Sequence, residues 1–436
     1  MNILHNTMCL LLSRYLALPL NVVTGILLAR VLGPEELGRY ALMVWLPSVL
    51  AGPMSLGLGN ANLYFGARDR GLGPSLVANS FAVSLGFFFI VICLLCGFPR
   101  IAVFEFPLGL TIMHFVAPLL DLPFRLATMF AMNLLNAWED HAHYRITEII
   151  QTVAYFVCCI VAVFVLHMGL WGFIGAQIAA SIVTSLYTIR CLWRHKCLSL
   201  RMDWDLLRRS LSYGMQVQVG SITRIGGQKL DELILLYFTG MRELGLLTLA
   251  RNLTNRFRVI PYSLSTIIGP RLSKADQEAF VLAATATRRM TVVMSGVVAM
   301  SVIAVGPLVP LVYGQAYIDV VLPVRIFLLM LIPLGMQRMF AVFMLAVGET
   351  TVFLQSVAIG AIAVVLLDFV LIPSLGVNGA VIASAIAITI ETYYVGRAFL
   401  RYSNMRCAEL FKPTMEDSAY FVSQYKVLIG KARGEG

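Results

Sequence analysis

The chain alternates long apolar stretches with short polar connections from one end to the other. Each apolar stretch is about 20 residues long, the length that an α-helix needs to cross the hydrocarbon core of a bilayer. Membrane-spanning strands would instead show about ten residues of alternating polarity, and the apolar runs here are too continuous for that. The pattern therefore predicts an all-α integral membrane protein with about twelve transmembrane helices. Their expected bounds are 8–30, 40–66, 76–98, 107–136, 145–167, 170–190, 210–238, 244–270, 289–312, 320–346, 352–372 and 377–399.

Three short motifs recur in the same order in both halves of the chain, about 207 residues apart. A small-residue motif alone often only allows close helix packing, but three collinear matches indicate an internal duplication. Because about six spans separate the copies, both halves enter the membrane in the same direction, as two lobes around a shared central cavity. The pairs are GPEELGRYAL (33–42) with GMRELGLLTL (240–249), Pro123 and Met129-Phe130-Ala131 with Pro333 and Met339-Phe340-Ala341, and GFIGAQIAAS (172–181) with GVNGAVIASA (376–385).

The duplication and the charges of the connections predict the domain organisation and the topology. Alternate connections differ in charge: one set and the C-terminal tail are rich in Lys and Arg, whereas the other set holds only Arg30, Arg39, Arg100 and Arg242. By the positive-inside rule, the basic set and both chain ends face the cytoplasm. The expected parts are an N-terminal six-helix lobe (1–192), a basic cytoplasmic linker (193–209), a C-terminal six-helix lobe (210–402) and a cytoplasmic tail (403–436).

Composition supports the membrane assignment, since 59% of the residues are hydrophobic and only 13% are charged. The net charge of +10 does not indicate nucleic acid, because the basic residues lie in short loops and the tail, where topology explains them. The first apolar stretch lacks a basic leader and a small-residue cleavage site, so we expect it to stay as the first span. The expected location is the bacterial cytoplasmic (inner) membrane.

Catalytic, metal and cofactor motifs are weak or missing in the sequence. The eight cysteines mostly lie within apolar runs, and the CxxC of Cys93 and Cys96 has no second pair to complete a metal site. His141 and His143, in the segment EDHAH, diverge on a helix, so no metal centre is expected there. A nucleotide-binding loop and a catalytic triad motif are also missing. We expect a non-enzyme without a cofactor, driven by a gradient, the membrane potential or its own substrate.

The predicted seventh span is unusual because it carries several charges within the apolar segment SITRIGGQKLDELILLYF (221–238). At about 100° per residue, one side of this helix holds Tyr213, Gly220, Arg224, Gln228 and Asp231. Lys229 and Glu232 are three residues apart and are expected to neutralise each other. A charged stripe in a membrane helix faces the protein interior or a water-filled cavity, since lipid would penalise it.

Other predicted spans carry similar polar positions. The eighth span, taken as one continuous helix, gives a stripe with Arg258 near its middle, and the first span gives a stripe that matches the seventh in the repeat register. In the fourth span, Asp121 and Arg125 have the spacing of an intrahelical ion pair. The tenth span contributes Arg338. The eighth-span stripe is Arg251, Asn255, Arg258 and Tyr262, and the first-span stripe is Arg14, Leu18, Asn21 and Gly25.

The excess of cations within the spans predicts an anionic ligand, and the planar fork of arginine suits phosphate. The alternative is that interhelical salt bridges and backbone carbonyls use up every arginine. Asp231 and Glu391 have no opposite charge one turn away, so each is a candidate to bind a coupling proton or Na⁺, or to pair with an arginine of a neighbouring span. The candidate substrate-binding residues are Arg14, Asn21, Arg224, Gln228, Arg251, Asn255, Arg258 and Arg338.

Several motifs resemble those of Wzx-type polysaccharide flippases of the multidrug/oligosaccharidyl-lipid/polysaccharide (MOP) superfamily. The resemblance covers nearly the whole chain and places Asp231 where the family usually has an acid in the seventh span. The motifs are ILLARVLGPEELGRYAL (26–42), LGLGNANLYFGA (56–67), KLDELILLYFTGMRELGLLTLARNL (229–253), GPRLSK (269–274) and LGVNGAVIASA (375–385).

The resemblance implies a function and partners. Members carry undecaprenyl-pyrophosphate-linked oligosaccharides from the cytoplasmic to the periplasmic leaflet for lipopolysaccharide or exopolysaccharide synthesis. They have twelve or fourteen spans and a positively charged central cavity. The plain tail after the twelfth expected span disfavours the fourteen-span branch. The implied partners are an anionic lipid-linked oligosaccharide, membrane lipids, and the polysaccharide polymerase and chain-length machinery.

Two other functions remain open at the level of the sequence. A cation-coupled small-molecule or multidrug exporter of the same superfamily would favour acidic cavity residues, whereas basic ones prevail here. A membrane glycan polymerase or glycosyltransferase usually needs a large external loop or a soluble catalytic domain, and the predicted external loops are short.

The charge pattern of the connections makes a direct prediction of topology. A reporter fused at Ser199 should lie in the cytoplasm and one fused at Glu36 on the opposite side, because these positions fall in connections of different charge class. Alkaline phosphatase and green fluorescent protein fusions at both sites measure this. Reporters that give the same side at both positions would contradict the predicted number of spans.

Overall fold

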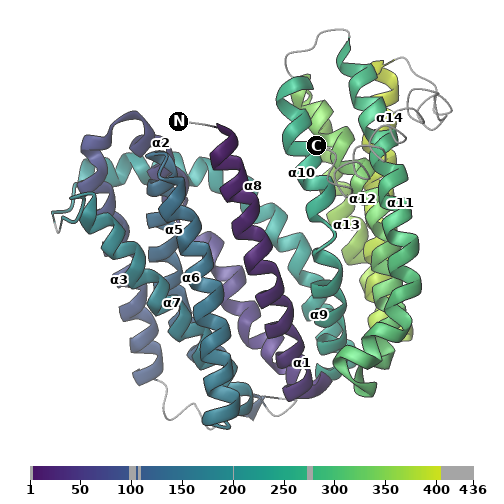
Figure 1. Ribbon diagram of the computed structural model, residues 1–436, viewed down its shortest axis with the longest axis horizontal. Helices are drawn as coiled ribbons and strands as arrows, with labels where there is room; N and C mark the ends of the chain where they lie inside the picture. Colours follow the sequence, from purple (N-terminus) through teal and green to yellow (C-terminus); the bar gives the residue numbers. More distant parts are fainter. Residues whose placement is uncertain (1–2, 98–104, 107–109, 200, 273–277, 404–436) are drawn as a thin grey trace, which may run out of the picture. The chain divides into compact units, whose positions relative to one another are not determined.

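The computed structural model describes residues 3–97, 105–106, 110–199, 201–272 and 278–403 (Figure 1). Nearly all of these residues lie in helices, which confirms the all-α prediction. The described strands, β1 (Glu105–Phe106) and β2 (Leu110–Thr111), form one short antiparallel pair. The helices are α1 (Ile3–Met54), α2 (Leu58–Arg68), η1 (Arg70–Leu72), α3 (Gly73–Gly97), α4 (Ile112–Val116), η2 (Ala117–Leu120), α5 (Asp121–Ala137), α6 (His141–Ile160), η3 (Val161–Val165), α7 (Gly169–Arg194), α8 (Trp204–Thr239), α9 (Met241–Asn255), α10 (Val259–Leu272), α11 (Glu278–Tyr313), η4 (Gln315–Val320), α12 (Val321–Ala346), α13 (Thr350–Leu375) and α14 (Val377–Ser403).

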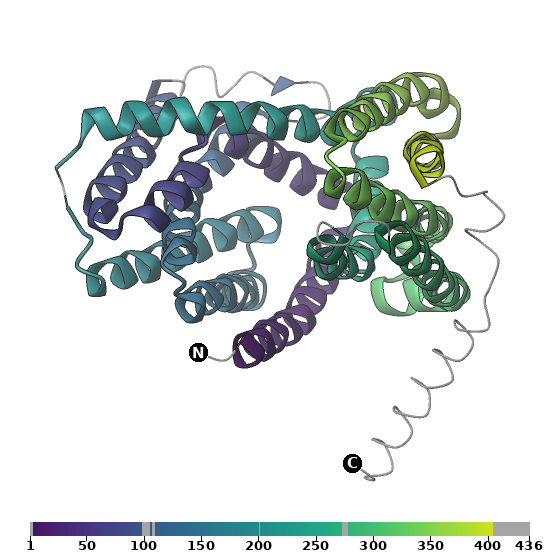
Figure 2. The ribbon, with the colours of Figure 1, turned by 90° about the horizontal axis from the view of Figure 1, so that it is seen from above.

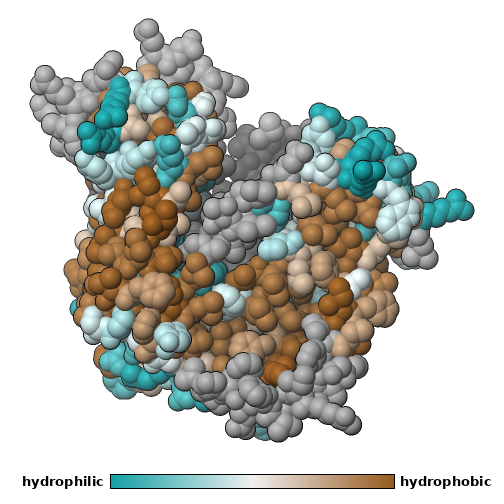
Figure 3. All heavy atoms as spheres, turned by 180° about the vertical axis from the view of Figure 1, so that it is seen from behind, coloured by the Kyte–Doolittle hydropathy of each residue, from teal (hydrophilic) through white to brown (hydrophobic). Residues whose placement is uncertain are grey.

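Among the described residues, eight helical segments are long and apolar enough to cross a membrane, or nine with the bent pair 19–54 and 58–68 counted as one more. The predicted seventh span corresponds to α8, which is long enough but rich in charge, and the predicted eighth span is divided between α9 and α10. Large apolar side chains such as Ile303 of α11 and Val370 of α13 are exposed, and brown apolar surface covers the middle of the helices between hydrophilic ends (Figure 3). This distribution fits contact with lipid, so the chain is a multi-pass membrane protein.

The described helices form two compact units. Unit 1 comprises residues up to 248 together with 312–317, and unit 2 comprises 249–311 and the helices from 318 onward. The sequence repeat predicts other boundaries, with a linker at 193–209 between two lobes. These lobe boundaries stay a prediction, because the two units are defined by contacts within each unit and not by the repeat.

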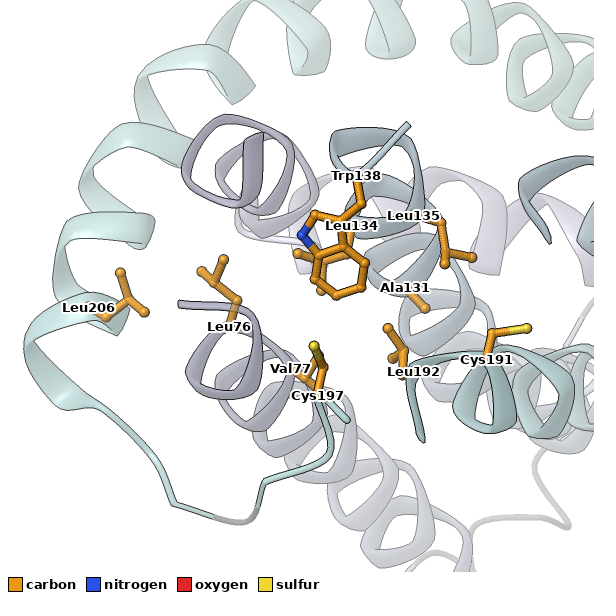
Figure 4. Packing of buried hydrophobic residues seen from close by; sticks show 10 residues of the cluster. All are labelled: Leu76, Val77, Ala131, Leu134, Leu135, Trp138, Cys191, Leu192, Cys197 and Leu206. Carbon is orange, nitrogen blue, oxygen red and sulfur yellow. The ribbon is translucent and has the colours of Figure 1, made fainter. Parts of the chain in front are cut away.

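Unit 1 is organised around α5. This helix packs against α2, α3 and α7, and α6 packs against both α7 and α1 (Figure 1). The long helix α8 lies across α1, α2 and α3 (Figure 2). One buried core cluster draws on α3, α5, α7, the segment after α7 and α8, so it joins elements far apart in the sequence. Its members are Leu76, Val77, Ala131, Leu134, Leu135, Trp138, Cys191, Leu192, Cys197 and Leu206 (Figure 4).

Unit 2 repeats part of this arrangement. The antiparallel neighbours α13 and α14 pack together as α6 and α7 do, and α12 packs against α14 as α5 packs against α7. The repeated motif of α5 and α12 also has equivalent packing, because Phe130 and Phe340 are both almost completely buried. These correspondences agree with the internal duplication that the sequence indicates.

Both copies of the first repeated motif begin with a glycine that interrupts a helix. Gly33 bends α1 with a φ of +74°, and Gly240 separates α8 from α9 with a φ of +92°. Positive φ values cost little for glycine because it has no Cβ atom. Each copy of the motif therefore restarts a helix in a new direction at the residue that follows its first glycine.

The second glycine of each copy lets α1 and α9 approach closely within unit 1. A Cβ atom added to Gly38 would overlap the backbone oxygen of Met241, and one added to Gly245 would overlap that of Pro34. The two contacts are reciprocal, since Pro34 and Gly38 occupy the same places in their motif as Met241 and Gly245. The two copies of the motif thus pack backbone against backbone.

This contact predicts that Gly38→Ala and Gly245→Ala each lower the melting temperature. The added methyl group meets backbone, which cannot move aside as a side chain can, so α1 and α9 must separate at a cost of roughly 1–3 kcal/mol. Gly175→Ala in α7 is the matched control, because nothing lies within 4 Å of its added Cβ. Thermal unfolding of the purified protein in detergent measures the change. Equal stability of all three variants would contradict the close contact.

Candidate substrate-binding site

The helix expected at 244–270 is broken, so the prediction of one continuous eighth span is wrong. The helix α9 ends at Asn255 and α10 begins at Val259, with tight turns between them in which the Phe257 N–H donates to the Thr254 carbonyl at 3.0 Å. Pro261 provides the physical reason, because it lacks an N–H and its ring clashes with the carbonyl of the residue four positions earlier. That carbonyl, on Phe257, instead accepts a hydrogen bond from the Ile260 N–H at 3.2 Å.

The break gathers the polar residues of the predicted stripe. The Arg258 Nη1 donates to Asn255 Oδ1 at 3.2 Å across the turn. Arg251 and Tyr262 lie close enough to Arg258 to interact with it electrostatically. At the interruption, Arg258 thus has Asn255 as a hydrogen-bond partner and Arg251 and Tyr262 as electrostatic neighbours. Two neighbouring guanidinium groups repel each other, so a bound anion would stabilise this arrangement.

Arg338 of α12 joins the same region of unit 2. Its guanidinium carbon lies 4.6 Å from the centre of the Tyr262 ring, and its Nε donates to Ser265 Oγ at 3.3 Å. A cation over an aromatic face is attracted by the ring quadrupole. Tyr262 therefore interacts with both Arg258 and Arg338, one before it in the chain and one from α12. Ser265 was missed in the sequence because its role depends on the packing of α10 against α12.

The next residue of α12 faces a different neighbour. Gln337 donates from Nε2 to Glu391 Oε2 of α14 at 3.3 Å. Glu391 lies against Gly360 of α13, where an added Cβ would overlap its side chain. The candidate coupling carboxylate is thus seated among three helices of unit 2. Gln337 was also missed, although a glutamine in an otherwise apolar span is a usable signal.

The candidate residues of unit 1 are less completely placed. Asn21 of α1 is exposed, and the side chains of Arg14, Arg224 and Gln228 lie outside the atoms that the structure describes. Asp231 is buried, and its Oδ1 accepts the Glu232 N–H at 2.8 Å. The site in unit 2 is therefore the one with a described geometry.

The predicted intrahelical ion pairs are present. Lys229 Nζ and Glu232 Oε1 are 3.0 Å apart on α8, and Arg125 Nη1 and Asp121 Oδ2 are 3.9 Å apart on α5. The carbonyl of Lys229 also accepts the Trp45 indole N–H at 3.2 Å, which fixes α8 against α1. Each pair neutralises charge within its own helix, which gives these groups a structural role in unit 1.

The fold defines a multi-pass membrane protein. A family model described as a polysaccharide biosynthesis protein matches residues 27–322, so the chain belongs to that family. A search among curated proteins returned no match.

Solved structures share this fold over nearly the whole chain. The lipid II flippase MurJ in an inward closed conformation has a TM-score of 0.72 at 14% identity and covers 94% of this chain and 89% of its own. An inward-facing multidrug resistance MATE family transporter of the MOP superfamily has a TM-score of 0.65 at 15% identity, with coverages of 90% and 94%. A MOP superfamily transporter from Pyrococcus furiosus has a TM-score of 0.60 at 13% identity, with coverages of 94% and 96%. The chain therefore has the fold of MOP superfamily transporters.

The contact of the Glu391 side chain with Gly360 predicts how a substitution of this glycine affects stability. The variant Gly360→Ala should lose roughly 1–3 kcal/mol of stability, because the added methyl group forces the Glu391 side chain out of its place beside Gln337. The double variant Gly360→Ala/Glu391→Ala should be as stable as Glu391→Ala alone, since the obstructing side chain is gone. Thermal unfolding of the four proteins measures this, with Gly296→Ala of α11 as the unobstructed control. A loss from Gly360→Ala that is the same in both backgrounds would contradict the contact.

Proposed function

We propose that this protein is a flippase that moves lipid-pyrophosphate-linked oligosaccharide units across the bacterial cytoplasmic membrane for polysaccharide biosynthesis, by alternating access. Membership of the polysaccharide biosynthesis family and the MOP transporter fold support a transport role in that process. The observation that carries the choice of substrate is the pair Arg258 and Arg338, which both interact with Tyr262 in unit 2.

The chemistry of this group fits a pyrophosphate. Both arginines are half-buried, so their charges are less screened than on an exposed surface. A guanidinium group can contact phosphate oxygens with two parallel hydrogen bonds, and a pyrophosphate offers several such oxygens. Tyr262 is partly exposed and holds the Arg338 guanidinium over its ring, which limits the entropy lost when that group orients toward a ligand. In this proposal the prenyl chain stays in lipid while the charged group enters the protein.

The remaining candidates extend the proposed site. Arg251 and Asn255 adjoin Arg258, and Asn21, Arg14, Arg224 and Gln228 are proposed to contribute from the first and seventh spans. Glu391 and Asp231 are proposed as coupling groups that bind a proton or Na⁺ during the cycle. The seating of Glu391 beside Gln337 supports this role, because Gln337 is an uncharged donor and leaves the negative charge of the carboxylate to attract a cation.

The alternative of a multidrug exporter is less well supported by the site. Multidrug substrates are commonly cations, which would require acidic rather than basic groups at the centre. The Pyrococcus furiosus transporter has a binding pocket of reversed polarity, for which a different function was suggested. Pocket polarity is thus a reasonable criterion in this superfamily, and the described basic group favours an anionic substrate.

Location and partners follow from the proposed function. The protein would lie in the inner membrane with both chain ends in the cytoplasm, where lipid-linked units are assembled. It would deliver them to the periplasmic leaflet, where the polysaccharide polymerase and chain-length machinery are the proposed partners.

Binding of a prenyl pyrophosphate to the purified protein tests the proposal. Arg258→Lys and Arg338→Lys should each weaken binding roughly ten- to a hundredfold, because a lysine keeps the charge but loses the two-point contact, a difference of about 1.5–3 kcal/mol. Prenyl monophosphate should bind less tightly and should discriminate less between arginine and lysine.

The matched control is Arg397→Lys, an exposed arginine on α14 of the same unit. Its affinity should equal that of the unaltered protein, and all proteins are compared at equal melting temperature. Unchanged affinity in both well-folded Arg258 and Arg338 variants would rule out the phosphate assignment.

A further inference from the structure

A cluster of three polar side chains lies at one end of unit 1. His143 Nδ1 lies 2.9 Å from both carboxylate oxygens of Asp140, and His195 Nε2 lies 2.8 Å from Asp140 Oδ2. One ligand atom from each of the three residues can be chosen so that all lie within 4.8 Å of one another. The cluster brings together residues that are distant in the sequence.

The C-terminal ends of α5 and α7 have similar backbone conformations, and together they bring Asp140 and His195 into contact. The helix α5 closes with the Asp140 N–H donating to the Leu135 carbonyl at 2.9 Å, and α7 closes with the Cys197 N–H donating to the Leu192 carbonyl at 3.1 Å. Both closures match the backbone pattern that commonly ends helices with a glycine in the left-handed region.

Glu139 and Lys196 occupy the left-handed positions of these closures, with φ values of +61° and +55°. A residue other than glycine costs roughly 1–2 kcal/mol there. These residues directly precede Asp140 and directly follow His195, so the backbone strain lies next to two members of the cluster. The chain retains this conformation because the surrounding packing determines it.

The cluster rests on a rigid support. The His195 ring lies 5.3 Å from the Trp138 ring, and Trp138 belongs to the buried core cluster that also contains Leu192 and Cys197 (Figure 4). Asp140 also caps α6, since its Oδ1 accepts the His143 N–H at 3.2 Å. Two of the three side chains are therefore held by a core or a cap rather than by a loose loop.

The hydrogen bonds of the cluster favour the negatively charged form of the Asp140 carboxyl group. Partial burial alone would raise the pKa of Asp140, but the hydrogen bonds from His143 and His195 outweigh it and lower this pKa below its ordinary value. The side chains of Asp140, His143 and His195 remain 16%, 31% and 37% exposed, so an ion from solution can reach them.

We propose that Asp140, His143 and His195 form a binding site for a divalent transition metal ion, with Zn²⁺ as the best match. Two imidazole nitrogens and one carboxylate oxygen form a known type of zinc ligand set, and a water molecule completes a tetrahedron. With metal–ligand distances of about 2.0–2.2 Å, tetrahedral ligands lie roughly 3.3–3.5 Å apart. The contacts of the two histidines with Asp140, at 2.9 and 2.8 Å, must therefore lengthen by about half an ångström, and the ligand atoms of the two histidines, which lie within 4.8 Å of each other, must reach the same separation. Imidazole ligands favour Zn²⁺ over Mg²⁺ or Ca²⁺, which prefer oxygen.

Metal binding would fasten the turn between α5 and α6 to the end of α7. The sequence pattern alone pointed away from a metal because it compared His143 with His141, which is not part of the cluster. The partner is His195, which lies in the predicted basic linker and reaches Asp140 only in the folded chain. The proposed metal site is independent of the proposed flippase function and would stabilise unit 1 in any transport state.

Zinc titration of the full-length protein, stripped of metal and purified in detergent, tests this proposal. The unaltered protein should bind one Zn²⁺ per chain by isothermal titration calorimetry, with a rise in melting temperature. His143→Gln and His195→Gln should each weaken this binding by about tenfold or more and abolish the thermal shift. His141→Gln is the matched control, since it removes a neighbouring imidazole outside the cluster, and it should bind Zn²⁺ like the unaltered protein.

Cobalt provides a second readout that does not depend on the stability of the variants. Co²⁺ added to the unaltered protein and to His141→Gln should give the visible absorption of a four-coordinate site, and excess Zn²⁺ should remove it. Failure of the unaltered protein to bind Zn²⁺, or equal binding by all four proteins, would overturn the assignment.

Discussion

The close backbone contact between Gly38 and Gly245 is the constraint on which the arrangement of unit 1 depends. It brings the two copies of one repeated motif together. Gly38 contacts the backbone of Met241, the first residue of α9, and Gly245 contacts the backbone of Pro34, which follows the bend in α1. Side chains at these positions would hold α1 and α9 apart, so the contact is specified by two residues that contribute no side chain of their own. The positive φ angles at Gly33 and Gly240 set the helix directions that make this meeting possible.

A second constraint is the interruption of the helix before Pro261. Backbone polar groups freed within a membrane must be satisfied by the protein or must line a water-filled cavity. Here tight turns satisfy part of the freed backbone, and the interruption carries Arg258 and Asn255. Transporters of several folds place substrate and ion sites where membrane helices are broken. The proposed phosphate site thus coincides with the place where the helix pattern fails.

The sequence predicts the helical membrane architecture and the duplication because apolar length and motif spacing are local signals. It also places Arg251, Asn255, Arg258 and Tyr262 on one stripe of a continuous helix. That helix is interrupted, and the substrate-binding role of these residues stays a prediction. Pro261 was the visible signal for the break. The contacts of Arg338 with Tyr262 and Ser265 could not be predicted from the sequence, because they depend on how α10 packs against α12.

The contact of His195 with Asp140 was unpredictable for the same reason: two helix ends must first fold before these residues meet. The contacts of the closely packed glycines could not be predicted from the sequence either. The sequence displays the repeated glycines of both motifs, but only the structure shows that the two copies contact each other. Local patterns therefore identify which residues are unusual, and packing decides what they contact.

Movement of a labelled substrate across a sealed bilayer measures the proposed flippase activity itself. The purified protein is reconstituted into vesicles that carry a fluorescent prenyl-pyrophosphate oligosaccharide in both leaflets, and a membrane-impermeant quencher is added outside. Label in the inner leaflet should become accessible to the quencher over time. The double variant Arg258→Lys/Arg338→Lys should slow this movement by about tenfold or more at subsaturating substrate. Inner-leaflet label that stays protected in the presence of the folded, unaltered protein would contradict the proposed function.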